Sequence, residues 1–98
     1  MFFKRDDINA GVEECRRTLR AVLLDVREAD EFQSGHIPGA VNLPLSQIRE
    51  AGLDKGAPIF AYCLRGTRSR QAAAELRRMG YTARSIGGIT RYKGALER

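Results

Sequence analysis

Short, continuous apolar runs alternate along the chain with segments in which apolar residues recur every three or four positions. Runs of the first kind cover residues 21–26 and 58–62, and they predict strands buried on both faces of a sheet. Residues 69–79 show the second pattern and predict an amphipathic helix that stops at Gly80. The predicted strands are 21–26, 40–43, 58–62 and 82–86, and the predicted helices are 6–19, 28–34, 45–51 and 69–79.

Strands that alternate with helices predict an α/β fold with a mainly parallel sheet. In such sheets, ligands bind beyond the carboxyl ends of the strands. Asp6 or Asp7 is the candidate cap of the first helix, and we expect Cys15 to pack in the core. Near the other end, Gly87-Gly88 predicts a turn into a terminal helical segment. The apolar face of the first helix holds Ile8, Val12, Cys15 and Leu19.

The composition is that of an ordinary globular protein, and it predicts one domain over residues 1–98. No apolar run reaches the roughly 20 residues of a membrane span. The start, MFFKRDD, is too short and too acidic for a signal peptide, so we expect a cytoplasmic protein with no membrane partner. The net charge is +5, but the arginines are scattered, which favours small anionic substrates over nucleic acid.

Cysteine and histidine are too few and too far apart for several kinds of site. Cys15 and Cys63 form no CxxC pair, which argues against a disulfide scaffold, a thioredoxin motif and a zinc site. His36 is the only histidine, so no cluster of metal ligands is expected. We therefore expect a protein that needs no metal ion.

The run YCLRGTRS, residues 62–69, carries the candidate chemistry. Cys63 ends an apolar strand, and a glycine-containing loop with two arginines leads from it to a helix. Backbone N–H groups and the helix dipole make an anion cradle at such a junction. A thiol placed there ionises more readily, and the thiolate is the nucleophilic form of cysteine. Cys63 is therefore the candidate nucleophile.

Two motifs, in this order and at this spacing, resemble the single-domain rhodaneses, a family of sulfurtransferases. The first is LLDVREADEFQSGHIPGAVNLPL at residues 23–45, and the second is YCLRGTRS followed by AAAELRRMGY and a Gly-Gly pair. The resemblance runs from about Val22 to Tyr92, where the family often has tryptophan at the position of Tyr92. It implies a three-layer α/β domain whose cysteine takes a sulfane sulfur from a donor such as thiosulfate. The cysteine then passes that sulfur from a persulfide to cyanide or a thiol.

By position, the resemblance makes Cys63 the nucleophile and residues 64–68 the loop around it. Asp25, Arg27 and His36 match the first motif, and we interpret them as structural support. For Asp25 and Arg27 we expect an ion pair or a loop contact. For His36 we expect a hydrogen-bonding role rather than that of a base, because an ionised thiolate needs no neighbouring base.

The loop residues admit both structural and donor-binding roles. Arg65 and Arg68 are either solvated side chains or contacts for an anionic donor, and we favour the donor for at least one of them. Gly66 suits a tight loop. Thr67 and Ser69 can donate hydroxyl hydrogen bonds to the sulfur, and Ser69 is equally a candidate N-cap. The candidate donor-binding residues are Leu64, Arg65, Gly66, Thr67, Arg68 and Ser69.

Three functions fit these residues. The first is an enzyme that moves a sulfane sulfur through a Cys63 persulfide, with a small anionic donor and a thiol or cyanide acceptor; this chemistry needs neither a metal nor an organic cofactor. The second is a phosphatase or arsenate reductase, against which the loop counts because Ser69 stands where a phosphatase has its arginine. The third is a sulfur carrier or partner-binding module that hands the same persulfide sulfur to another protein.

Overall fold

The computed structural model describes residues 6–98; residues 1–5, which begin the run MFFKRDD, lie outside the described residues. The four strands of the described chain form one parallel sheet in the order β2-β1-β3-β4. The predicted α/β class and parallel sheet are therefore confirmed. In chain order, the elements are α1 (Ile8–Arg17), β1 (Val22–Asp25), α2 (Ala29–Ser34), β2 (Val41–Asn42), the 3-10 helix η1 (Leu45–Glu50), β3 (Ile59–Cys63), α3 (Thr67–Arg78), β4 (Ala83–Gly88) and the 3-10 helix η2 (Ile89–Arg91).

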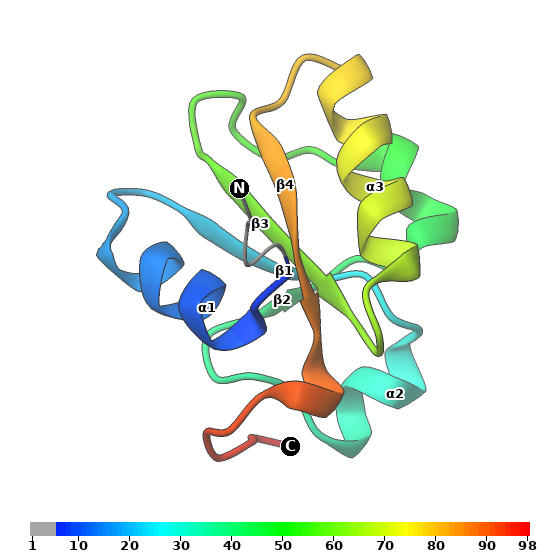
Figure 1. Ribbon diagram of the computed structural model, residues 1–98. Helices are drawn as coiled ribbons and strands as arrows, with labels where there is room; N and C mark the ends of the chain where they lie inside the picture. The colour runs from blue at the N-terminus through cyan, green and yellow to red at the C-terminus, as the bar shows by residue number, and fades with distance from the viewer. Residues whose placement is uncertain (1–5) are drawn as a thin grey trace, which may run out of the picture.

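Helices cover both faces of the sheet, with α1 on one face and α3 and η1 on the other (Figure 1). Strand β3 is buried along its whole length because its side chains alternate between these two cores. Ile59 and Ala61 pack toward α3, whereas Phe60 and Tyr62 pack toward α1. Cys63 follows the same alternation and lies on the α3 side. Among residues 6–98, no helix is long and apolar enough to cross a membrane.

The first helix is shorter than the sequence pattern predicts. It ends at Arg17, so the prediction that Leu19 belongs to its buried face is wrong, and Leu19 is 85% exposed. Of the two candidate caps, Asp7 takes the position, because its carboxylate accepts N–H groups from the first turn. The prediction that Cys15 lies in the core is confirmed.

The glycine pair lies inside β4, so the predicted turn at Gly87-Gly88 is wrong. The terminal helical segment is limited to η2, and the predicted helix at residues 45–51 is the 3-10 helix η1. A Cβ at Gly88 would lie 2.3 Å from the carbonyl oxygen of Leu64. Glycine at this position therefore lets the loop after β3 pack directly on the neighbouring strand.

Candidate active site

The sulfur of Cys63 lies at the start of helix α3. Gly66 is the N-cap residue and has a φ of +108°, a left-handed conformation that favours glycine. Because Gly66 has no side chain to cap the helix, the cysteine sulfur takes that place. Cys63 Sγ accepts the Gly66 N–H at 3.0 Å and the Ser69 N–H at 3.3 Å. The predicted cradle of backbone N–H groups is therefore present around this sulfur.

The cradle favours negative charge on the sulfur. Hydrogen bonds from N–H groups stabilise a charged acceptor more than a neutral one, and the dipole of α3 acts in the same direction. Cys63 is only 1% exposed, so little water competes with these donors. The N–H groups of Thr67 and Arg68 also lie in the first turn, where a helix leaves its amides without an intrahelical acceptor. This arrangement suits a thiolate or a sulfur chain extended by one atom.

Ser69 is buried and is not the N-cap, so that alternative is wrong. Its hydroxyl lies 3.5 Å from Cys63 Sγ and donates to the carbonyl oxygen of Gly66 at 3.1 Å. Thr67 is exposed on the outside of α3. Sequence reasoning missed Ser85, whose hydroxyl on β4 is 2.7 Å from that of Ser69. No short-range signal connects these two serines, because strand pairing brings them together.

The two loop arginines have different surroundings. Arg68 forms a two-point ion pair with Glu31 of α2, with N–O distances of 2.7 and 3.0 Å. The hydrogen bonds from Arg68 lower the pKa of the Glu31 carboxyl to about 2 from an ordinary value of 4.5. The guanidinium of Arg68 is thus already bound to a carboxylate, which leaves Arg65 as the better candidate for an anionic donor.

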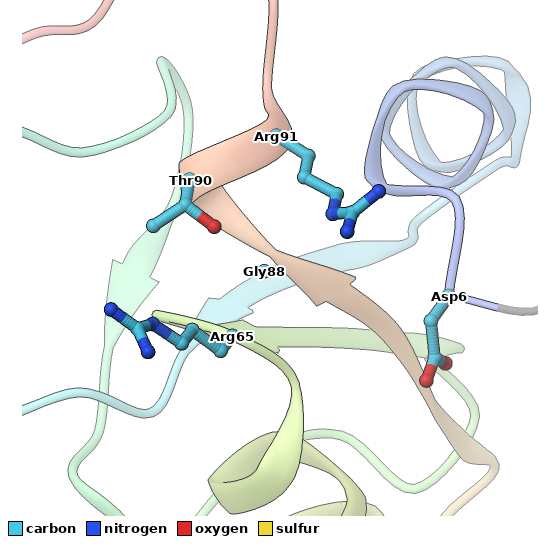
Figure 2. Close-up of a pocket in the computed structure, with 5 residues that line it drawn as sticks. All are labelled: Asp6, Arg65, Gly88, Thr90 and Arg91. Carbon is cyan, nitrogen blue, oxygen red and sulfur yellow. The ribbon is translucent and has the colours of Figure 1, made fainter.

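Arg65 is exposed and lines a pocket of about 550 Å³ beside the loop. Figure 2 shows Gly88 between Arg65 and Arg91, with Thr90 above Gly88 in this view and Asp6 on the side away from Arg65. Gly88 pairs with Cys63 in the sheet, so the pocket begins one strand away from the sulfur. Cys63 itself does not line this pocket, and an anion held there would be beside the cradle rather than inside it.

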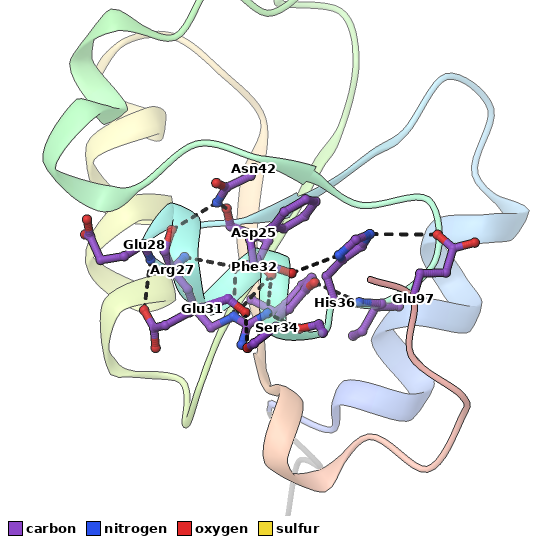
Figure 3. Close-up of polar contacts among 12 residues, drawn as sticks. Asp25, Arg27, Glu28, Glu31, Phe32, Ser34, His36, Asn42 and Glu97 are labelled. Carbon is purple, nitrogen blue, oxygen red and sulfur yellow. Dashed lines mark hydrogen bonds and ion pairs between the residues drawn. The ribbon is translucent and has the colours of Figure 1, made fainter.

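Asp25 and Arg27 form the expected ion pair at the end of β1 (Figure 3). The Arg27 guanidinium donates to Asp25 Oδ2 at 2.8 Å and to the carbonyl oxygen of Gly35 at 2.7 Å. Burial acts to lower the pKa of Arg27, but the hydrogen bond and charge of Asp25 outweigh it and raise that pKa. Asn42 adds bonds to the carbonyl oxygens of both partners. This pair joins β1 to the loop that follows α2.

His36 holds the C-terminal segment against α2. Its Nδ1 is 3.0 Å from the carbonyl oxygen of Phe32, and the two rings are stacked (Figure 3). Its backbone exchanges two hydrogen bonds with Glu97, and its Nε2 lies 3.8 Å from a carboxylate oxygen of the same residue. These contacts agree with the expected hydrogen-bonding role. Tyr92 packs in part against the α1-side core.

Other chemical groups form no comparable site in the described chain. Among residues 6–98, no cluster of three His, Cys, Asp or Glu side chains could hold a metal ion. Cys15 is 6% exposed on the inner face of α1, and burial raises the pKa of its thiol. Arg16 lies close enough to act in the opposite direction, but among residues 6–98 the backbone N–H groups that donate to a cysteine sulfur are at Cys63 and not at Cys15.

Comparison with known proteins agrees with this architecture. The model of the rhodanese-like domain family matches residues 6–95. This chain belongs to the rhodanese-like domain family. It is 42% identical over 92 residues to the uncharacterized protein YqhL of Bacillus subtilis, covering 87% of this chain and 71% of YqhL. It is 38% identical over 71 residues to the thiosulfate sulfurtransferase PspE of Escherichia coli, covering 67% of this chain and 68% of PspE.

A solved rhodanese-like structure has the same fold. The human single-domain sulfurtransferase TSTD1 superposes with a TM-score of 0.71 at 28% identity, covering 84% of this chain and 88% of the human one. In a tRNA sulfurtransferase from Desulfurococcus amylolyticus, the region similar to this chain is only 16% of the protein's length. Rhodanese-like domains therefore occur both as most of a protein and as a small part of one.

Proposed function

We propose that this protein is a sulfurtransferase that carries a sulfane sulfur on Cys63. The observation that carries the proposal is the pair of N–H groups, from Gly66 and Ser69, that donate to Cys63 Sγ. The donor is thiosulfate or a persulfide, and the acceptor is cyanide or a thiol. Similarity to proteins named as sulfurtransferases, PspE and TSTD1, supports the same class of reaction.

The reaction has two halves. The Cys63 thiolate attacks the outer sulfur of thiosulfate, so that an S–S bond to Cys63 forms and the bond to the sulfonate sulfur breaks. Sulfite leaves with the electron pair of the broken bond. The acceptor then attacks the terminal sulfur of the persulfide, and the Cys63 thiolate leaves with the electrons of its S–S bond. The first-turn N–H groups of Thr67 and Arg68 stabilise the charged terminal sulfur between the two halves.

The loop favours a small donor with negative charge. Cys63 is 1% exposed, so the group that delivers sulfur has to be slender. Arg65 supplies positive charge in the pocket beside the loop, while Arg68 is engaged by Glu31. A sulfur carrier would use the same persulfide and would differ only in giving the sulfur to a protein. Phosphatase chemistry is disfavoured by the spacing of the loop, because Ser69 stands where a phosphatase has its arginine.

Intact-mass analysis after incubation with thiosulfate tests this proposal. We expect the wild-type protein to gain one sulfur atom, peptide mapping to place it on Cys63, and cyanide to remove it as thiocyanate. Cys63→Ser should gain none, whereas the matched variant Cys15→Ser should behave like the wild type. Sulfur on Cys15 alone, or equal uptake by Cys63→Ser, would contradict the proposal. Hydrolysis of an aryl phosphate that disappears in Cys63→Ser would instead support the phosphatase alternative.

A further inference from the structure

A second serine lies behind the one that faces Cys63. Ser85 belongs to β4, and its Oγ is 2.7 Å from Ser69 Oγ. The sheet register changes here: Ser85 pairs with Ala61, but the next residue of β3 pairs with Gly87. This irregularity is a β-bulge, a feature that redirects side chains beside functional sites. Ser85 precedes the bulge and, two residues after Ala83, lies on the α3 side of the sheet, where its hydroxyl contacts Ser69 in the first turn of α3.

The Ser69 hydroxyl has one proton and more than one neighbour that can accept it. Its oxygen lies 3.1 Å from the carbonyl oxygen of Gly66, 2.7 Å from Ser85 Oγ and 3.5 Å from Cys63 Sγ. When Cys63 is a neutral thiol, its S–H donates to Ser69 Oγ and the Ser69 proton is free for Gly66. When the sulfur is charged, the same Ser69 proton can turn toward it.

Turning the Ser69 proton to the sulfur leaves no buried group without a partner. The carbonyl oxygen of Gly66 also accepts the N–H of Arg70 at 3.1 Å, so it keeps a hydrogen bond when Ser69 turns away. Ser69 Oγ remains satisfied only if another group donates to it, because the thiol proton is gone. Ser85 is the hydroxyl within reach, and its own oxygen accepts the Gly87 N–H at 3.4 Å. The arrangement therefore avoids the cost of an unsatisfied buried polar atom.

We propose that Ser85 is a positioning residue for the nucleophile. It donates a hydrogen bond to Ser69 Oγ, and the Ser69 hydroxyl is then free to donate its own hydrogen bond to the charged sulfur of Cys63. Chains of hydrogen bonds that point the same way strengthen one another, so the Ser85–Ser69 pair supports the charged sulfur better than Ser69 alone. This inference rests on the proposed function only in taking Cys63 as the reactive cysteine. It does not depend on which sulfur donor or acceptor the protein uses.

Two substitutions at Ser85 that are isosteric with each other, threonine and valine, test the proposal. Threonine keeps the hydroxyl and valine removes it, while both add the same bulk and both suit a strand. We measure the alkylation rate of Cys63 by iodoacetamide at fixed pH, which requires no sulfur donor. Ser85→Val should react about fivefold more slowly than Ser85→Thr, as expected for the loss of one hydrogen bond of ordinary strength. Thr82→Val, which removes an exposed hydroxyl just before β4, is the control and should match the wild type.

A double-mutant cycle shows whether Ser85 acts through Ser69. Ser69→Ala should slow alkylation by about tenfold, because it removes a donor to a charged group. In the Ser69→Ala background, Ser85→Val should have no further effect. In thiosulfate turnover, Ser85→Val should lower kcat and leave KM unchanged, since the pair touches the nucleophile and not the donor.

Each outcome has a definite meaning. Equal alkylation rates for Ser85→Val and Ser85→Thr would overturn the proposal, and so would an undiminished effect of Ser85→Val in the Ser69→Ala background. If alkylation follows the expected pattern but no variant takes up sulfur, the positioning role stands and the proposed sulfur transfer fails. The comparison of Ser85→Val with Ser85→Thr tests the positioning role of Ser85 even if Ser69→Ala does not fold.

Discussion

Cys15 and Cys63 are both buried, yet their surroundings differ in kind. Exposure alone ranks Cys15 as the more accessible thiol, at 6% against 1% for Cys63. The hydrogen-bond donors rank them in the opposite order. Two N–H groups donate to Cys63 Sγ, whereas Cys15 faces an apolar core and burial raises the pKa of its thiol. For this pair, the local donors rather than the exposed fraction should decide which thiol reacts.

The difference follows from where each cysteine lies in its element. Cys15 is inside α1, where the backbone N–H groups are used by hydrogen bonds within the helix. Cys63 is the last residue of β3, close to the start of α3, where the first-turn N–H groups have no acceptor in the helix. A strand end followed at once by a helix start therefore provides donors that a helix interior cannot provide.

Alkylation of the native protein is the strongest test of this comparison. Iodoacetamide should modify Cys63 about 100-fold faster than Cys15 at neutral pH, because within residues 6–98 backbone N–H groups donate to the sulfur of Cys63 and none donates to that of Cys15. Denaturant should bring the two rates together, since unfolding removes both environments. Peptide mapping over time gives the two rates. A faster reaction at Cys15 in the native protein would show that exposure, and not the donors, controls reactivity.

Added methyl groups should affect the two regions differently. A Cβ at Gly88 would lie 2.5 Å from the Cα of Arg65, so Gly88→Ala forces the Cys63 loop to move. We expect Gly88→Ala to slow sulfur uptake by about 30-fold, because a displaced loop no longer aims its N–H groups at the sulfur. A Cβ at Gly11 would instead lie 2.4 Å from Ile86 Cβ, between α1 and the sheet. Gly11→Ala should lower the melting temperature and leave sulfur uptake per folded molecule unchanged.

Gly52→Ala is the control for both variants, because no atom lies within 4 Å of a Cβ built there. It should change neither uptake nor melting temperature. Uptake by single-turnover mass analysis and melting by circular dichroism separate the two effects. A normal uptake rate in a folded Gly88→Ala protein would show that the loop geometry is not what activates Cys63.

Apolar patterning predicted the main elements of the fold because burial sets the pattern. The wholly buried strand β3 and the helix α3 lie where the sequence placed them, within a few residues. The predicted end of a helix was wrong where the apolar spacing continues beyond the last helical residue. Leu19 has the spacing of the buried face of α1, but the helix ends at Arg17. The glycines of β4 suggested a turn, although they are needed for close packing inside a strand.

The polar contacts of the site were much harder to predict. Cys63 and its loop are visible as one continuous stretch, since strand, loop and helix start follow each other in the chain. Glu31 lies 37 residues from Arg68, and Ser85 lies 16 residues from Ser69. Such pairs depend on how elements pack, and the periodicity of apolar residues carries no information about them. The competition between donor binding and the Glu31 ion pair for Arg68 could therefore be decided only in three dimensions.

The two arginines of the loop should contribute unequally to donor use. Arg65→Gln should raise KM for thiosulfate about fivefold, because an exposed charge beside the loop contributes roughly 1 kcal/mol to attraction of a dianion. Arg68→Gln should have a smaller effect on KM, since Glu31 already neutralises that guanidinium. Added salt should shrink the Arg65 effect. Steady-state kinetics with thiosulfate and with an uncharged persulfide donor measures it, and an equal loss for both donors would mean that Arg65 shapes the loop instead.

The Glu31–Arg68 ion pair should make the Cys63 side of the molecule sensitive to acid, while the apolar packing around Cys15 is not. Glu31→Gln keeps an oxygen that can accept the Glu28 N–H and removes only the charge. The pair is partly exposed, so we expect a loss of about 0.5 kcal/mol in the free energy of unfolding at neutral pH. Asp30→Asn, which removes a carboxylate from the same first turn of α2, is the control.

The direction of the pH dependence follows from the lowered pKa of Glu31. Its pKa is about 2 in the folded protein against an ordinary value of 4.5, so folding favours the ionised carboxylate. The stabilisation is complete above the ordinary value, declines as the pH falls, and is absent once the pH is below about 2. Urea unfolding of the wild type and Glu31→Gln should therefore differ at neutral pH and converge in acid. A difference that persists at the lowest pH would show that Glu31 stabilises the protein through packing and not through its charge on Arg68.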